Sequence, residues 1–364
     1  MRKILSILLC VTMLIGYIPA GVAMAEEANP LPQTPAAYAA SDYAKYAAKM
    51  AVGGRHAAAV KPDGTVVAWG NNEYKQTNVP EGLSGVKAIA AGSNHTLALK
   101  DDGSLVGWGS GYDAATAAWV PYTIPTELQG VKVKSIAAGS NMSAVVKENG
   151  GVVIWGYNSD NLTTTIPAGL GNVVAVAINC KGVVALNDEG KVTVWGDSEN
   201  NVIPEGLTQG NVVAVAAGTW QWMALEKTGK VDLWGYSGHI DACGGIKTHT
   251  NARAIASGKM LAAALLADGT IACYGNKLPA GFNTITNAMA ITTVVEPVGS
   301  GASNLCAMQK YGTVLACGPI AEINSVPAGL NLINMTGSSN NADLSGLVVA
   351  GYDLAPTFAA ETET

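Results

Sequence analysis

Short runs of Val, Ile, Leu and Ala recur along the chain and are separated by polar turns centred on glycine. One segment shows the pattern: KAIAAG (87–92) and TLALK (96–100) are apolar runs, Asp102-Gly103 is a turn, and SLVGWG (104–109) follows. None of these runs is long enough for a pair of helices, and their length and β-branched content are typical of strands. The sequence therefore predicts an all-β chain of short antiparallel strands.

The pattern repeats with a period near 40 residues. IAAGSNHTLALKDDGSLVGWG (89–109) returns at 136–156, 215–235 and 255–275, and weaker copies occupy 50–70, 176–196 and roughly 294–318. One residue, directly before the last glycine of each copy, marks the period: Trp69, Trp108, Trp155, Trp195, Trp234, Tyr274 and Cys317, at spacings of 39, 47, 40, 39, 40 and 43. Antiparallel strands repeated around an axis describe a β-propeller.

Turn residues define the strands of each copy. A glycine with positive φ is expected in the hairpin between the second and third strands, at Gly64, Gly103, Gly150, Gly190, Gly229, Gly269 and Gly312. A fourth segment is marked by Val79-Pro80, Ile124-Pro125, Ile166-Pro167, Ile203-Pro204, Leu278-Pro279 and Val326-Pro327. Proline lacks an amide donor, so this segment belongs at an outer edge.

We therefore predict a seven-bladed β-propeller of four-stranded antiparallel blades. Residues 335–353 keep Gly337 and Ser345-Gly346 but have no marker Trp. They could complete the first blade, which would close the ring and remove an exposed edge, or form an eighth blade.

The chain begins with a pattern typical of a secretory signal. Arg2 and Lys3 precede an apolar run over 4–18, and Ala23-Met24-Ala25 offers a cleavage site. The alternative is a membrane anchor, but the run is shorter than the ~20 residues that span a bilayer. We expect a signal peptide at 1–25, a secreted protein, and no membrane span in the mature chain.

The remaining boundaries follow from composition. Residues 26–47 are predicted to form an extended leader and a short N-terminal helix, because 36–49 is rich in strong helix formers. The propeller is expected to occupy 48–353, with a loose tail at 354–364.

Composition excludes some classes of protein. The chain of 364 residues is 49% hydrophobic and 13% charged, which suits a large core and not a disordered protein. Its 21 Lys and Arg against 27 Asp and Glu give a net charge of −6, and no basic block occurs. Binding to nucleic acid is therefore disfavoured.

The copies resemble repeats of the regulator of chromosome condensation family, and most closely its secreted bacterial members, which include a propeller-type β-lactamase inhibitor. AWGNNEYKQTNVPEGLSGVKAIAAGSNHTLALKDDGSLVGWG (68–109) carries nearly the whole pattern, and the resemblance extends over about 48–352. It implies a propeller that binds protein. Nucleotide exchange on a small GTPase, the activity of the family's nuclear members, is argued against by the export signal.

Candidate binding residues gather in two sets of loops. In an up-and-down blade, the connections between strands one and two and between strands three and four open on the same face. Aromatic and polar residues are expected there, at Tyr74, Asn94, His95, Tyr112, Trp119, Asn141, Tyr157, Asp160, Trp220, Tyr236 and His239. The marker Trp residues are instead predicted to pack the blades.

The resemblance to the β-lactamase inhibitor can be compared at individual loop positions. In the β-lactamase inhibitor, aromatic residues on the two loop sets bind the enzyme, and Trp220 is the clearest aromatic match here. At corresponding positions this chain has Asn94, Asn141 and Met260 instead. Trp119 lies in an eight-residue insertion of the second copy.

Catalytic motifs are scarce. The chain has no GxSxG, no HExxH, no phosphate-binding loop and no paired-cysteine zinc spacing, so no cofactor or metal is expected. Asp160 and Asp197 could meet across neighbouring blades and support glycosidase chemistry, but such loop acids are usually solvated.

Five cysteines follow the signal segment: Cys180, Cys243, Cys273, Cys306 and Cys317. A two-residue turn at Tyr311-Gly312 would place Cys306 opposite Cys317 and allow a disulfide. The alternative is two small apolar residues within a blade.

These features predict a monomeric, non-enzymatic protein that binds a protein partner through its loop face. A β-lactamase or penicillin-binding enzyme is the most concrete target that the resemblance suggests. A module that binds cell-wall glycan is the alternative, because aromatic loops also stack on sugar rings.

Overall fold

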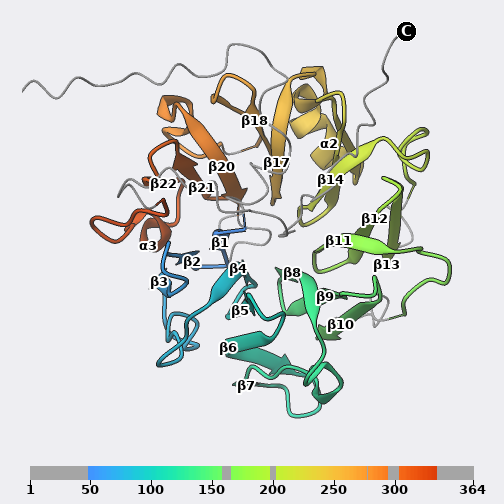
Figure 1. Cartoon of the computed structure of the whole chain (residues 1–364). Helices are drawn as coiled ribbons and strands as arrows, with labels where there is room; N and C mark the ends of the chain where they lie inside the picture. Colours follow the sequence, from blue (N-terminus) through green and yellow to red (C-terminus); the bar gives the residue numbers. More distant parts are fainter. Residues whose placement is uncertain (1–47, 158–164, 197–201, 277, 294–302, 334–364) are drawn as a thin grey trace, which may run out of the picture. The chain divides into compact units, whose positions relative to one another are not determined.

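The apolar runs of each repeat form consecutive antiparallel strands. The computed structural model describes residues 48–157, 165–196, 202–276, 278–293 and 303–333. Over these residues the strands make seven sheets, and Figure 1 shows the sheets arranged in sequence order around a common centre. The predicted seven-bladed propeller is therefore confirmed.

The first strand of each blade lies nearest the centre. These strands are β1 (Met50–Val52), β4 (Val86–Ala91), β8 (Val133–Gly139), β11 (Val173–Ile178), β14 (Val212–Ala217), β17 (Ala252–Gly258) and β20 (Ala288–Thr293). They are buried along most of their length.

The middle strands are almost wholly buried: β2 (His56–Val60), β5 (His95–Lys100), β9 (Met142–Lys147), β12 (Gly182–Asn187), β15 (Gln221–Glu226), β18 (Leu261–Leu266) and β21 (Leu305–Gln309). The third strands are β3 (Val66–Gly70), β6 (Leu105–Asp113), β10 (Val152–Gly156), β13 (Val192–Gly196), β16 (Val231–Gly235), β19 (Ile271–Gly275) and β22 (Val314–Cys317). Blade two adds β7 (Ala118–Pro121), which pairs with the end of β6.

The hairpin glycines adopt the predicted conformation. All seven have a positive φ, between 76° and 85°. In the β5–β6 hairpin, the Lys100 amide donates to Ser104 O and the Gly103 amide donates to Lys100 O, both at 2.9 Å. The loop therefore has three residues and ends on a left-handed glycine, which is a common hairpin geometry.

The outer segments differ from the prediction. Among the described residues, six sheets have three strands and one has four. The proline-marked segments instead form turns and short helices, which include η2 (Thr126–Leu128), η4 (Phe282–Thr284) and α3 (Ala321–Asn324). They cover the third strands with buried side chains such as Leu128, Leu207 and Ile285.

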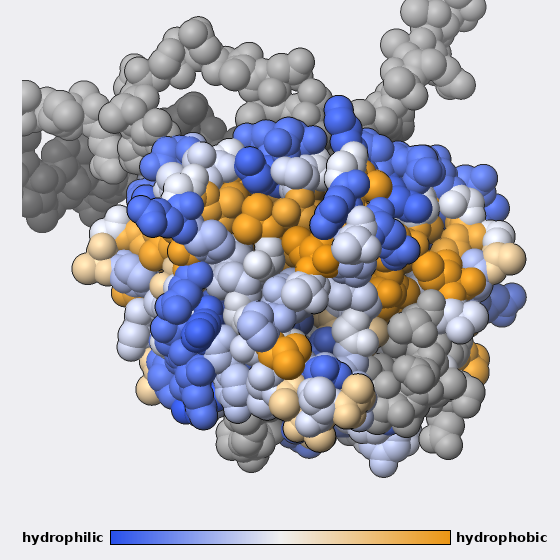
Figure 2. All heavy atoms as spheres, turned by 90° about the horizontal axis from the view of Figure 1, so that it is seen from below, coloured by the Kyte–Doolittle hydropathy of each residue, from blue (hydrophilic) through white to orange (hydrophobic). Residues whose placement is uncertain are grey.

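Blade five carries an outer helical addition, α2 (Ser237–Cys243) followed by η3 (Gly244–Thr248). Figure 2 shows the rim of the ring from the side of blades two and three, where a hydrophobic band runs between hydrophilic regions.

Blade seven packs directly against blade one and closes the ring. Met50 and Val52 of β1 share a hydrophobic cluster with Ala290 of β20 and Met308 of β21. The Trp69 indole donates a hydrogen bond to Ile323 O at 2.8 Å. Closure therefore needs no further blade, while the candidate eighth copy at 335–353, the 26–47 leader and helix, and the signal segment lie outside the described residues.

The marker tryptophans pack the blades as predicted. Trp69, Trp108, Trp195 and Trp234 are buried, and Trp155 is half-buried.

The proposed disulfide was wrong. The β21–β22 turn has three residues, because the Gln309 amide donates to Thr313 O at 2.9 Å. The register then pairs Cys306 with Ala316 and Leu305 with Cys317. A slip of one residue turns a side chain to the other face of a strand, so the two thiols point to opposite sides. None of the five cysteines, all of which lie in the described ranges, forms a disulfide.

Candidate binding face

The two loop sets meet at one end of each blade, as far as their residues are described. In blades one, two, three, five and six, the residue after the strand-three glycine donates its amide to a carbonyl of the strand one to two loop of the same blade. These bonds join Asn71 to Arg55 O, Ser110 to Asn94 O, Tyr157 to Asn141 O, Tyr236 to Trp220 O and Asn276 to Met260 O, at 2.8–3.2 Å. The loop face is the surface formed by these two loop sets.

A glycine makes this close approach possible. Gly109 has a φ of +96°, and a Cβ there would lie 2.4 Å from Asn94 O. A side chain would therefore push the two loops apart. The glycines that follow the other marker residues also have a positive φ, from 103° to 149°: Gly70, Gly156, Gly196, Gly235, Gly275 and Gly318.

Four predicted aromatic residues come together across blades one to three. Trp119 lies 4.9 Å from Tyr74 and 5.4 Å from Tyr112, and Tyr112 lies 4.8 Å from Tyr157, measured between ring centroids. The β6–β7 hairpin pairs Tyr112 with Trp119. Trp119 is 38% exposed. We call these four residues the aromatic arc.

A second group of predicted residues lies on blade five. The Trp220 and Tyr236 rings are 6.2 Å apart, and His239 meets Tyr236 edge-on at 5.6 Å. Lys181 of blade four places its ammonium group 5.2 Å from the Trp220 ring centroid. Tyr236 is 52% exposed, so this group presents an aromatic surface beside a cation.

Three predicted contact residues have buried side chains, which corrects the prediction. Asn94, His95 and His239 are each less than a tenth exposed. His95 lies in β5, inside blade two, and His239 lies in α2, the outer addition of blade five. Asn141 is half-buried at the surface, and Asp160 lies outside the described residues, as does Asp197.

His95 supports the face from beneath. Its Nε2 lies 2.9 Å from Ser143 Oγ of blade three, and its ring stacks on Tyr122 at 4.4 Å. Burial, with a contribution from the charge of His56, lowers the pKa of His95 to about 3. The imidazole is therefore neutral at physiological pH and acts as a structural hydrogen-bonding group.

Tyr122 was missed by the sequence analysis. Its hydroxyl lies 2.7 Å from Ser143 Oγ. Its ring packs over Gly107, and a Cβ on Gly107 would lie 2.5 Å from the Tyr122 ring. Gly107 was the available signal, because a glycine inside a strand often marks a close approach.

The described residues hold no cluster of His, Cys, Asp and Glu able to bind a metal ion. Within the same ranges, no helix is both long enough and apolar enough to cross a membrane.

Comparison with known families identifies the repeat. The family model for the regulator of chromosome condensation (RCC1) repeat matches residues 47–76, 86–113 and 133–161. The chain carries RCC1 repeats. A search of curated proteins finds no match.

Solved propellers share the fold of these RCC1 repeats. The CRINKLY WD40 ectodomain of the Arabidopsis thaliana receptor kinase ACR4 aligns with a TM-score of 0.58 at 17% identity, over 79% of this chain and 98% of that one. Yeast RCC1 (Prp20), in its structure bound to Kap60, gives a TM-score of 0.50 at 18% identity, over 87% and 92%. At these identities the likeness concerns the fold alone.

Proposed function

We propose that the chain is an exported, non-enzymatic propeller that binds a protein partner through its loop face. The observation that carries this proposal is the aromatic arc. Tyr74, Tyr112, Trp119 and Tyr157 come from three blades and form one continuous run of ring contacts.

The physical argument concerns how binding energy is distributed. A few aromatic residues, rigid and partly buried before binding, can supply most of the energy of an interface. The arc is fixed in advance: the Ser110 hydroxyl donates to Tyr74 O at 3.1 Å, and β7 holds Trp119 against Tyr112. The loops that carry the arc are therefore ordered before a partner docks.

For the partner we propose a secreted or surface-bound β-lactamase or penicillin-binding enzyme. The resemblance of 68–109 to secreted bacterial repeat proteins supports this choice, and the signal-like segment at 1–25 supports export. Inhibition would be steric, because a rigid ring laid over the mouth of an active site blocks substrate without any chemistry of its own.

A glycan of the cell wall is the second candidate. The exposed rings of Trp119 and Tyr236 favour it, since sugar rings stack on such surfaces.

The test uses the chain from residue 26 onward as bait for culture supernatant and cell envelope. Purified β-lactamases, penicillin-binding enzymes and peptidoglycan are then each tested separately for binding to the same bait. We expect Trp119→Ala to weaken capture of the protein target at least ~30-fold, the loss typical of an interface hot spot. Trp220→Ala tests the second group in the same way.

Tyr311→Ala is the matched control. Tyr311 is 56% exposed and lies in the β21–β22 hairpin, at the opposite end of a blade from the loop face. Its loss should change capture less than about twofold, as expected for a residue outside the interface. Equal effects of the Trp119 and Tyr311 variants would refute the loop-face proposal. Binding to peptidoglycan with no effect on β-lactamase turnover would select the glycan candidate.

A further inference from the structure

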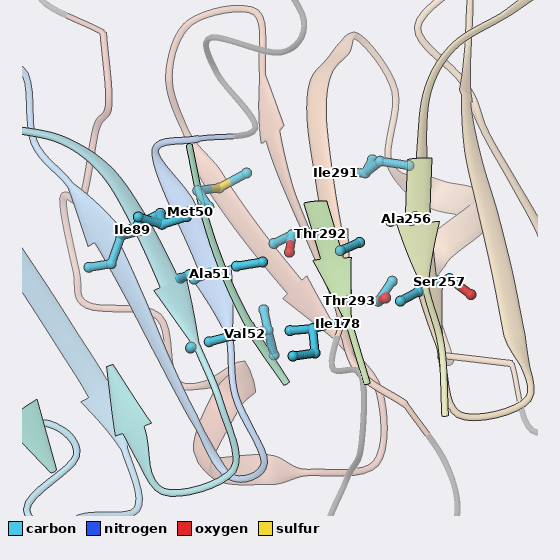
Figure 3. Close-up of a pocket in the computed structure, with 18 of the residues that line it drawn as sticks. Met50, Ala51, Val52, Ile89, Ile178, Ala256, Ser257, Ile291, Thr292 and Thr293 are labelled. Atoms are coloured by element: carbon cyan, nitrogen blue, oxygen red, sulfur yellow. The ribbon is translucent and has the colours of Figure 1, made fainter. Parts of the chain in front are cut away.

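The innermost strands enclose a cavity at the centre of the ring. Residues of β1, β4, β8, β11, β14, β17 and β20 line it, and its volume is about 140 Å³. Figure 3 shows side chains from several of these strands pointing into the same space. This central channel is separate from the loop-face residues described above.

The side chains of the channel wall are almost wholly apolar. All of the lining residues except Ser257, Thr292 and Thr293 are Ala, Val, Ile or Met, and no charged residue is among them. The three hydroxyl residues belong to the neighbouring strands β17 and β20. The wall therefore has a broad apolar part and one small polar patch.

The polar patch contains a hydroxyl without a partner. Thr293 is 6% exposed, and its Oγ1 makes no hydrogen bond to any residue that the structure describes. The Ser257 hydroxyl, in contrast, accepts a bond from Gln221 Nε2 at 2.9 Å. Thr292 is half-buried beside Thr293. A buried hydroxyl that lacks a partner is costly, so a group that reached it from the channel would gain a bond that the folded chain leaves unmade.

The size of the channel limits the ligand. An apolar protein cavity of about 150 Å³ holds one benzene molecule. We propose that the central channel binds a single small amphiphilic molecule: an aromatic ring or short alkyl group that carries one hydroxyl. The apolar part contacts the alanine and isoleucine side chains, and the hydroxyl bonds to Thr293 Oγ1.

Phenol and benzene test this proposal as a matched pair, because they differ by one hydroxyl. Titration calorimetry on the chain from residue 26 onward should show saturable binding of one molecule of phenol. Phenol should bind about threefold to tenfold more tightly than benzene, the range expected for one neutral hydrogen bond. Thr293→Val keeps the shape of the wall and should abolish the preference for phenol without loss of benzene binding.

A second pair of variants tests the location. Ala138 lines the channel, so Ala138→Leu should fill it and weaken phenol binding more than about tenfold. Ala328→Leu makes the same change at an exposed position and should leave binding intact. The proposal is overturned if neither probe binds the wild-type chain saturably, which would mean that the channel holds water only. It is also overturned if Ala138→Leu binds phenol as wild type does. Capture of a protein partner is independent of both results.

Discussion

At the scale of single residues, buried polar groups tie neighbouring blades together beneath the loop face. His56 Nε2 lies 3.0 Å from Thr96 Oγ1, and His95 Nε2 lies 2.9 Å from Ser143 Oγ. Gln221, which like His95 stands three residues after its strand-one glycine, donates instead to Ser257 Oγ in strand one of blade six. Each bond links a middle strand to the next blade.

Acid should weaken this link because His95 is buried as a neutral group. Burial lowers its pKa in the folded chain to about 3, against 6.5 for the ordinary side chain. As the pH falls below about 6.5, the unfolded chain takes up a proton that the folded chain does not, so stability is lost until the pH reaches the folded value. At pH 4.5 we expect His95 to contribute a loss of about 2 to 3 kcal/mol.

Urea unfolding of wild type and His95→Gln at pH 7.5 and pH 4.5 measures this loss. Glutamine cannot titrate, and blade five already uses it at this position. The free energy of unfolding should fall less in the variant than in wild type. Equal losses in the two proteins would show that His95 is not the group responsible.

At the scale of elements, one glycine per blade sets the geometry of the loop face. Gly109 brings the start of the β6–β7 hairpin against Asn94 O, and Gly130 has a comparable positive φ of 73° with nothing within 4 Å of a Cβ. The two positions separate the cost of backbone conformation from the cost of a clash.

Gly109→Ala should therefore destabilise the protein far more than Gly130→Ala. The backbone term alone costs about 1 kcal/mol, whereas the clash with Asn94 O requires the two loops to move and should cost more than about 3 kcal/mol. Thermal or urea unfolding compares the variants. If both variants lose the same stability, the close approach of the two loops is not the reason that position 109 requires glycine.

The strands and turns were predictable because each has a signal in the local sequence. Alternating apolar runs and the hairpin glycines placed β4, β5 and β6 close to where they lie. The register of β21–β22 was not predictable, because two-residue and three-residue turns both accept Gly312. The burial of His95 was missed because the sequence pattern left this residue in a loop, whereas β5 begins at His95 and Tyr122 stacks on its ring.

At the scale of the whole molecule, closure of the ring depends on contacts between blades one and seven. The Trp69 indole donates to Ile323 O, and Arg55 forms an ion pair with Glu322, both across this seam. The ion pair is partly exposed, and such pairs contribute little to stability. The buried tryptophan is therefore the stronger element of closure.

Trp69→Phe removes the indole N–H from the seam. Trp234→Phe is the matched control, since Trp234 is similarly buried and its Nε1 has no hydrogen-bond partner among the described residues. We expect the Trp69 variant to lose about 1 to 3 kcal/mol more in the free energy of unfolding, the cost of leaving Ile323 O unpaired. A smaller or reversed difference would mean that this bond does not hold the ring closed.

Amide hydrogen exchange with and without a captured protein partner tests the loop-face proposal most directly. Binding should slow exchange in the loop-face segments 71–78, 110–121 and 236–239 and leave the hairpins at 61–65 and 309–313 unchanged. Protection confined to those hairpins, or to the outer strands, would contradict the proposal that the loop face receives the partner.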